Sequence, residues 1–284
     1  MTYRECYEKG SRILNEAGIE ESTLDARLLL EAVCGTNRND LLVHGEQPVE
    51  PEAEEKYFGW IGKRAGRIPL QQLTGEQDFM GLTFTVNENV LIPRQDTEIL
   101  VEEVLKELHD GMRILDMCTG SGCILLSLLH YSNDCEGLGV DLSAEALEVA
   151  GRNVLKVLPP EKAEHAHFLQ SDLFEKVEGK FEIIVSNPPY IASAEVEKLM
   201  PEVRDHEPRM ALDGTEDGLY FYRRIIEEAG KHLVSSGMLF LEIGYDQGQA
   251  VSELMRTEGY CEVQVVQDYA GLDRVVLGTY CERN

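Results

Sequence analysis

The chain has 284 residues, of which 43% are hydrophobic and 27% are charged, a composition that suits one large or two modest globular domains. Its formal net charge of −26 argues against a protein that grips a phosphate backbone, because such proteins present a basic face. A protein partner, including a basic one, fits this charge better.

The sequence also excludes a membrane protein and a disulfide-rich secreted protein. No apolar run approaches the roughly 18 residues of a membrane span, and the first residues lack the apolar core of a signal peptide. The seven cysteines are scattered and form no CxxC pair, so we expect neither a disulfide nor a zinc site. We therefore predict a cytoplasmic protein without a structural metal.

Residues 1–75 predict a small helical bundle. Apolar residues recur at helical spacing in three stretches, residues 3–17, 24–34 and 51–66. Ser22 suits the N-cap of the second helix, and Gly35 suits its C-terminal stop. The segment shows no catalytic chemistry, so it is either a recognition domain or a packing appendage.

Residues 76–92 predict a β-hairpin that links this bundle to the rest of the chain. Apolar and polar residues alternate over residues 79–86, residues 87–89 (Asn-Glu-Asn) suggest a turn, and residues 90–92 resume an extended run. An extended segment and an amphipathic helix follow up to about residue 109.

The next stretch predicts the first strand-turn-helix unit of a Rossmann-like sheet. Residues 113–117 read as a strand and residues 123–130 as a helix. The glycines of the turn between them let the backbone approach a ligand closely, and N–H groups at the helix start face that ligand. The candidate cofactor-binding residues of this turn are Cys118, Thr119, Gly120, Ser121 and Gly122.

Three aspartates end successive predicted strands: Asp116, Asp141 and Asp172. Asp141 is placed to bind a ribose diol, and Asp172 could accept a hydrogen bond from an adenine amino group while Leu173 packs on the ring. A dinucleotide site is an alternative, but the turn lacks the GxGxxG pattern and three carboxylates would repel a pyrophosphate. They suit a cationic nucleoside such as S-adenosylmethionine.

A buried strand at residues 181–186 ends at the tetrad Asn187, Pro188, Pro189 and Tyr190. The β-branched run at 183–185 indicates a strand covered on both faces, and the two prolines cannot extend a central ladder. The tetrad therefore lies at the carboxyl edge of the sheet, where ligands bind in such folds.

This tetrad suits the binding of a planar NH2 group. The side-chain carbonyl of Asn187 and the backbone carbonyl of Pro188 can accept its two N–H bonds, and Tyr190 can lie flat against it. Transfer of a methyl group to the nitrogen then needs positioning more than a base. We predict Asn187, Pro188 and Tyr190 as catalytic and all four residues as substrate-binding, with Asn187 also beside the cofactor.

The remaining residues complete the sheet. Residues 191–215 predict an irregular loop over the site, residues 238–243 a further buried strand, and residues 263–266 and 275–277 an antiparallel pair around Gly271.

Together these motifs resemble the HemK/PrmC family, the protein-(glutamine-N5) methyltransferases of peptide chain release factors. The matching motifs are Ile-Pro-Arg at 92–94 with Asp-Thr-Glu at 96–98, residues 116–122, Asp141, the tetrad at 187–190, and Glu-Pro to Ala-Leu at 207–212. The tetrad alone is not specific, because adenine and guanine methyltransferases use similar ones. Cys118 departs from the glycine that many family members have.

The resemblance implies a seven-stranded class I methyltransferase domain at residues 93–284, behind a helical domain at 1–75 and a hairpin at 76–92. S-adenosylmethionine would lie over residues 118–122, with Asp141 on the ribose and Asp172 and Leu173 at the adenine. The acceptor would be the glutamine of the Gly-Gly-Gln (GGQ) loop of a release factor, docked by the helical domain. We expect a monomer that contacts neither nucleic acid nor membrane.

Three alternatives stay open from the sequence. A sister enzyme that methylates a glutamine of a ribosomal protein would share the whole catalytic core. A nucleic-acid amino-group methyltransferase would use the same tetrad, although the acidic charge argues against it. A catalytically silent binding module is disfavoured by the intact tetrad and the acidic strand ends.

Overall fold

The computed structural model describes residues 1–281, which divide into two compact units. The first unit contains residues 1–75 together with the short segment 200–206. The second contains residues 76–199 and the chain from residue 207 onward. Within the described residues, no helix combines the length and the apolar character that crossing a membrane would require.

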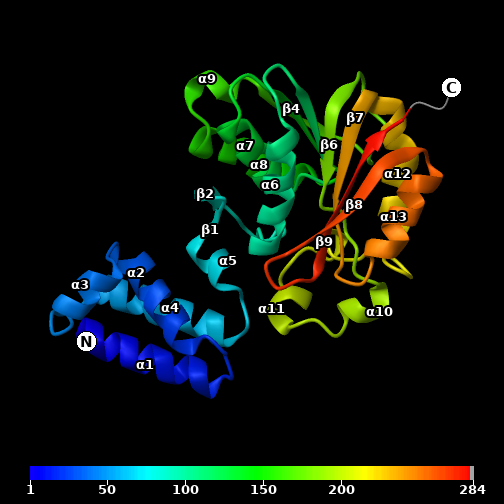
Figure 1. Cartoon of the computed structure of the whole chain (residues 1–284). Helices are drawn as coiled ribbons and strands as arrows, with labels where there is room; N and C mark the ends of the chain where they lie inside the picture. The colour runs from blue at the N-terminus through cyan, green and yellow to red at the C-terminus, as the bar shows by residue number, and fades with distance from the viewer. Residues whose placement is uncertain (282–284) are drawn as a thin grey trace. The chain divides into compact units, whose positions relative to one another are not determined.

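The first unit is a helical bundle, as the sequence predicts (Figure 1). Its helices are α1 (Tyr3–Glu16), α2 (Ser22–Cys34), α3 (Arg38–Val43), α4 (Pro51–Ala65), α5 (Leu70–Thr74) and, from the distant segment, α11 (Pro201–Arg204). Helices α1, α2 and α4 pack around a core that includes Leu14, Leu29 and Tyr57. Ser22 is not the N-cap that we predicted: it is the first helical residue, and Glu21 occupies the cap position.

A buried ion-pair cluster fastens the segment 200–206 into this unit. The Nε atom of Arg64 donates to Asp25 at 2.7 Å, and its Nη1 atom donates to Glu202 at 3.0 Å. Arg67 donates to the same oxygen of Glu202 at 3.1 Å. Burial raises the pKa of Glu202, but hydrogen bonds from its own backbone, Arg64 and Arg67 together lower it by more, so the net shift of the pKa is downward. The cluster keeps two nearly buried carboxylates paired, which they require away from water.

A two-stranded hairpin opens the second unit. Strands β1 (Glu76–Phe79) and β2 (Leu82–Thr85) pair antiparallel. The chain reverses at Met80 and Gly81, whose φ angles are +52° and +72°, so the hairpin does not reverse at residues 87–89 as we predicted. Those residues do form a turn, in which the Val90 N–H donates to the Asn87 carbonyl oxygen at 3.4 Å. Two central residues with positive φ match the twist of the flanking strands better than a longer turn does.

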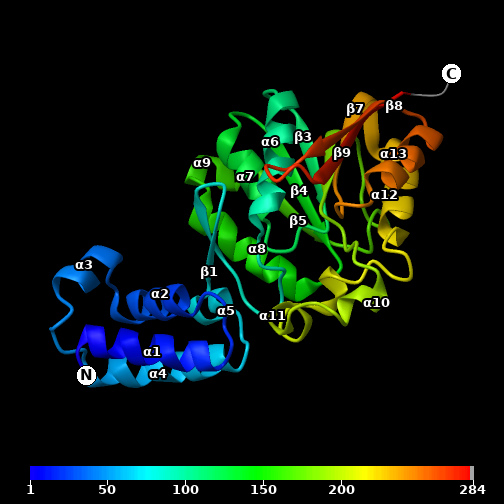
Figure 2. The same ribbon diagram turned by 60° about the horizontal axis from the view of Figure 1, so that its bottom comes forward.

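The rest of the second unit is a seven-stranded sheet with helices on both faces (Figures 1 and 2). Its strands are β3 (Arg113–Met117), β4 (Glu136–Asp141), β5 (Ala166–Gln170), β6 (Phe181–Ser186), β7 (Leu233–Glu242), β8 (Tyr260–Gln267) and β9 (Asp273–Tyr280), in the order β5-β4-β3-β6-β7-β9-β8. Strands β3 to β7 run parallel, and β9 is antiparallel to β7 and β8. This arrangement confirms the predicted class I methyltransferase fold.

The two faces of the sheet are covered by different helices. One face carries α6 (Glu98–Glu107), α7 (Cys123–Tyr131) and α8 (Ala144–Val157), and the other carries α12 (Tyr220–His232) and α13 (Gly248–Thr257). The short elements α9 (Pro160–Ala163), α10 (Ser193–Val196), η1 (Gln95–Thr97) and η2 (Arg209–Ala211) lie in the connections. Ile183 packs with the first set and Ile184 with the second. Because both faces are covered, polar groups of the central strands gather at the carboxyl edge.

One prediction about the cysteines is wrong. Cys261 in β8 and Cys281, just after β9, form a disulfide. They are 20 residues apart in sequence, and the antiparallel pairing of β8 with β9 brings them together, with Cys261 opposite Thr279. A spacing rule for cysteines cannot anticipate this pairing, because it depends on the strand register.

Replacement of Arg64 tests the ion-pair cluster. Arg64→Ala leaves the buried carboxylates of Asp25 and Glu202 short of a partner, so we expect the free energy of unfolding of the first unit to fall by on the order of 3 kcal/mol. Trp60 is the single tryptophan of the chain and packs on the core of this unit, so a urea titration followed by tryptophan fluorescence reports it. Lys63→Ala, at an exposed position of the same helix, is the control. Equal urea midpoints for the two variants would contradict the prediction.

Candidate active site

The side chain of Asp116 holds the turn after β3 in place through hydrogen bonds. This carboxyl group is fully buried, and its Oδ2 atom accepts hydrogen bonds from the Thr119 hydroxyl group at 2.5 Å and from the Leu125 N–H at 3.3 Å. Burial raises the pKa of Asp116 to about 7, although both hydrogen bonds lower it. Asp116 thus ties strand, turn and α7 together, and its predicted contact with a cofactor stays a prediction.

The backbone of the turn adopts left-handed conformations. Gly120 and Gly122 have φ angles of +55° and +79°, and Cys118 has +62°. A Cβ atom at Gly122 would also come within 3.2 Å of Leu126 and Ala150. The turn therefore needs its two glycines, and Cys118 adopts a conformation that is uncommon outside glycine.

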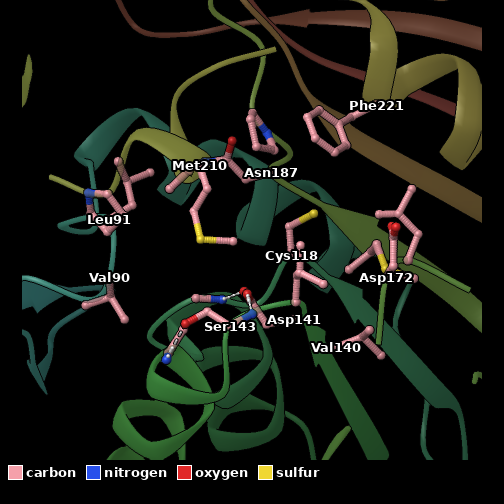
Figure 3. Close-up of a pocket in the computed structure, with 18 of the residues that line it drawn as sticks. Val90, Leu91, Cys118, Val140, Asp141, Ser143, Asp172, Asn187, Met210 and Phe221 are labelled. Carbon is pink, nitrogen blue, oxygen red and sulfur yellow. Dashed lines mark hydrogen bonds between the residues drawn. The ribbon is translucent and has the colours of Figure 1, made fainter. Parts of the chain in front are cut away.

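The Gly120 N–H donates to the Oδ2 atom of Asp141, the last residue of β4, at 2.9 Å. The other oxygen of Asp141 accepts the N–H of Ser143, also at 2.9 Å (Figure 3). Burial raises the pKa of Asp141, and these N–H groups lower it. Each carboxylate oxygen accepts more than one hydrogen bond, so Asp141 retains capacity for a diol on the cavity side.

A cavity opens at the carboxyl edge of the sheet, between this turn and the end of β6 (Figure 3). The predicted site residues that line it are Cys118, Gly120, Asp141, Asp172, Leu173, Asn187 and Pro189. The predicted residues that lie outside the lining are Asp116, Thr119, Ser121, Gly122, Pro188 and Tyr190. The structure thus brings residues from the carboxyl ends of four strands, β3 to β6, to one cavity.

Several lining residues escaped the sequence reasoning. Val90 and Leu91 follow the hairpin, and Ser143 is the N-cap of α8. Met210 belongs to η2, and Phe221 belongs to α12. The Glu-Pro to Ala-Leu motif at 207–212 could have identified Met210 as a site residue. No sequence motif identifies Phe221, because its position at the cavity depends on how α12 packs.

The loop that carries Met210 is anchored by Glu207. The buried carboxyl group of Glu207 accepts the N–H of Ile92 at 3.1 Å and pairs with Arg94. The motifs Ile-Pro-Arg and Glu-Pro thus meet in space, although 113 residues separate Arg94 from Glu207.

Asp172 has a partner that the sequence did not reveal. Arg224, from α12, donates to its Oδ1 atom at 2.9 Å. This contact fixes the side chain at the cavity wall and offsets its charge.

The tetrad is held by side chains from three other segments. The Nδ2 atom of Asn187 donates to the Thr97 hydroxyl oxygen at 3.3 Å, and the Tyr190 hydroxyl group donates to Glu242 at 3.3 Å. Gln247 donates to the carbonyl oxygen of Tyr190 at 3.0 Å. None of Thr97, Glu242 and Gln247 was among the predicted site residues.

Glu242, the last residue of β7, is only 2% exposed. Burial raises the pKa of Glu242 to about 7, while hydrogen bonding from Thr97, the charge of Arg274 and the Tyr190 hydroxyl group lower it. Burial raises the pKa of Tyr190 as well, so its hydroxyl group remains a donor at neutral pH.

Comparisons with known proteins agree with this geometry. Residues 5–75 match the family described as PrmC N-terminal domain, and residues 94–203 match the Methyltransferase small domain. The release factor glutamine methyltransferase of Geobacter sulfurreducens is 40% identical over 266 residues, which cover 93% of this chain and 92% of the relative. That of Moorella thermoacetica is 43% identical over 281 residues, 98% of each chain.

The chain belongs to the release factor glutamine methyltransferase family. It is therefore a methyltransferase whose cofactor is S-adenosylmethionine. A solved methyltransferase from Pyrococcus furiosus shares the fold, with a TM-score of 0.53 and 19% identity over 78% of this chain and 99% of that one.

Asp141→Ala tests the cofactor cavity. Loss of a charged acceptor and of the Gly120 contact should weaken binding of S-adenosylmethionine by roughly 10- to 100-fold, measured by titration calorimetry. Glu136→Ala removes an exposed carboxylate at the opposite end of the same strand and should leave affinity unchanged. An unchanged affinity in Asp141→Ala would contradict the predicted ribose contact.

A second test concerns the pH dependence of stability at Asp116. The folded pKa near 7 lies above the unfolded value of about 3.9, so between these values the folded state binds more protons. Stability contributed by this group is therefore present at low pH and is lost as pH rises through about 7. Asp116→Asn should flatten this decline in urea titrations, whereas exposed Asp134→Asn should not. Parallel curves for wild type and Asp116→Asn would contradict the prediction.

Proposed function

We propose that this protein transfers a methyl group from S-adenosylmethionine to the side-chain amide nitrogen (N5) of the glutamine in the GGQ motif of peptide chain release factors. The observation that carries this proposal is Asn187. Its Nδ2 atom donates to Thr97 beside the cavity that Asn187 lines, and among the described residues its Oδ1 atom accepts no hydrogen bond. Membership of the family gives the class of substrate.

The residues of the cavity fit the cofactor. Asp141 offers acceptor capacity for the ribose, the turn at 118–122 provides a close backbone approach, and Leu173 and Phe221 provide apolar surface for the adenine. When bound, S-adenosylmethionine supplies an electrophilic methyl group on a sulfonium sulfur. The acidic side chains at this edge suit its positive charge.

The tetrad would hold the glutamine amide. Asn187 Oδ1 and the Pro188 carbonyl each accept one N–H of the substrate NH2 group, and Tyr190 flanks the amide plane. The nitrogen would form a bond to the methyl carbon as the bond from that carbon to the sulfonium sulfur breaks, and the nitrogen would then release one proton. The contribution of the protein is mainly orientation, so no general base is assigned.

The helical unit is proposed to dock the release factor. We further propose that the enzyme acts in the cytoplasm as a monomer that does not contact nucleic acid directly. The net charge of −26 supports the last point, because it disfavours a phosphate backbone.

Asn187→Ala tests this function in a tritiated-methyl transfer assay. The wild-type enzyme should label purified release factor and should not label a release factor whose GGQ glutamine is changed to alanine. Asn187→Ala should lose at least about 100-fold in rate, because it removes an acceptor that orients the nucleophile. Its affinity for S-adenosylmethionine in calorimetry should stay within a few-fold, which separates lost chemistry from lost folding.

Total RNA, total DNA and ribosomal proteins serve as competing substrates in the same assay. Label on nucleic acid, on a ribosomal protein alone, or on the alanine version of the release factor would overturn the proposed substrate. Full activity of Asn187→Ala would overturn the role of the tetrad.

A further inference from the structure

Asn153 places an amide group where helix packing alone would favour an apolar side chain. It lies inside α8 and is completely buried, although asparagine is usually exposed and is a poor helix former. Ala146 and Val149, on the same face of the helix, are apolar. Packing of α8 therefore does not explain why position 153 is polar, and the explanation lies in the hydrogen bonds of the amide group.

The amide group of Asn153 joins two segments that are distant in sequence. Its Oδ1 atom accepts the N–H of Thr85, the last residue of β2, at 2.7 Å, and its Nδ2 atom donates to the carbonyl oxygen of Thr85 at 3.0 Å. The same Nδ2 atom donates at 2.9 Å to the carbonyl oxygen of Ser121, which belongs to the cofactor turn (residues 118–122). A backbone N–H can only donate and a carbonyl oxygen can only accept, so these partners fit a single orientation of the amide group.

Both segments continue into the lining of the cofactor cavity. The cofactor turn contributes Cys118 to this lining, and the hairpin exit (residues 86–91, which follow β2) contributes Val90 and Leu91. Figure 3 shows these three side chains around the same space. The amide group of Asn153 therefore connects two walls of one cavity.

Apolar packing holds the hairpin exit on the same helix. Val86 and Val90 form a buried cluster with Ala146 and Val149 of α8. Such contacts are not directional, whereas a hydrogen bond requires a defined distance and angle. Asn153 therefore adds the directional restraint that places the hairpin exit relative to the cofactor turn.

We propose that Asn153 is a positioning residue that fixes the hairpin exit relative to the cofactor turn and thereby sets the affinity of the cavity for S-adenosylmethionine. Asn153 does not line the cavity, so it acts through the backbone of Thr85 and Ser121. The link is reciprocal, because a ligand that binds between two joined walls also stabilises the hydrogen bonds that join them. The inference concerns the cofactor and goes beyond the proposed methyl acceptor.

The first experiment uses the unmodified protein. The N–H of Thr85 exchanges its hydrogen with solvent when its bond to Asn153 opens, so its exchange rate reports the link. Saturating S-adenosylhomocysteine, the cofactor without its methyl group, should slow this exchange at least about tenfold in NMR-detected hydrogen exchange. Amides of β8, the strand at one edge of the sheet, are the control and should change much less. Equal exchange rates of Thr85 with and without the ligand would overturn the proposal.

The second experiment removes the link. Asn153→Ala keeps α8 helical, because alanine is the strongest helix former, but it leaves the partners on both walls without the amide group. In titration calorimetry, the Kd for S-adenosylhomocysteine should rise at least about tenfold. A merely structural residue would lower the stoichiometry, which reports the folded fraction, and would leave the Kd unchanged.

Two control variants accompany Asn153→Ala. Arg152→Ala changes an exposed residue of the same helix. Tyr260→Phe removes a buried hydrogen bond to the carbonyl oxygen of Ile226, which belongs to α12. Both should keep the wild-type Kd. A rise of the Kd in Tyr260→Phe equal to that in Asn153→Ala would show a general effect of destabilisation and would overturn the positioning role.

A third experiment tests whether Asn153 acts through the hairpin exit. Val86→Ala removes apolar contacts of this segment at a position outside the cavity lining, so it should raise the Kd for S-adenosylhomocysteine. In an Asn153→Ala background the same change should raise the Kd by a smaller factor, because the hairpin exit is already released. No effect of Val86→Ala alone, or equal factors in the two backgrounds, would contradict the proposal.

The proposal stays testable if Asn153→Ala does not fold, because the exchange of Thr85 in wild type and the Kd of Val86→Ala then decide it. None of the three experiments contains a methyl acceptor. Failure of this inference and failure of the proposed function are therefore separate results.

Discussion

The site depends on one constraint: helices cover both faces of the parallel sheet. Strands β3, β4 and β6 lie between α6–α8 on one side and α12–α13 on the other. Their buried side chains are therefore mostly apolar, and the polar side chains that can bind a ligand lie at the carboxyl edge of the sheet. Asp141 ends β4 and Asn187 follows β6. Parallel pairing brings the ends of these strands to one cavity.

Buried carboxyl groups hold the segments that build this edge. Asp116 holds the turn after β3, Glu207 holds the segment that begins at Ile92, and Glu242 holds Tyr190. A carboxylate removed from water is costly unless donors surround it, so each acid is stable only when those segments are in place. The same requirement fixes Glu202 among arginines in the first unit. Buried acidic residues thus stabilise contacts between segments, in addition to contributing to the large negative net charge.

Local patterns in the sequence predicted much of the fold. The β-branched run before Asn187 and the small-residue turn at 118–122 identified β6 and the first strand-turn-helix unit correctly, because strand and turn composition depend on neighbouring residues. The reversal of the hairpin at Met80 and Gly81 was missed, because Met-Gly is not one of the residue pairs that usually form two-residue hairpin turns. The bond between Cys261 and Cys281 was missed because strand register is a property of the folded sheet.

The sequence by itself determined the class of this protein: the tetrad at 187–190, the acidic strand ends and the flanking motifs are short patterns whose chemistry is carried by adjacent residues. Only the tertiary structure decided which side chains support them. Thr97 lies 90 residues from Asn187, and Glu242 lies 52 residues from Tyr190. No periodicity connects such pairs, because the order of β6 and β7 in the sheet and the position of Thr97 beside Asn187 set the hydrogen-bond partners. The hydrogen-bond partner of the Asn187 amide group is therefore a property of the fold and not of the motif.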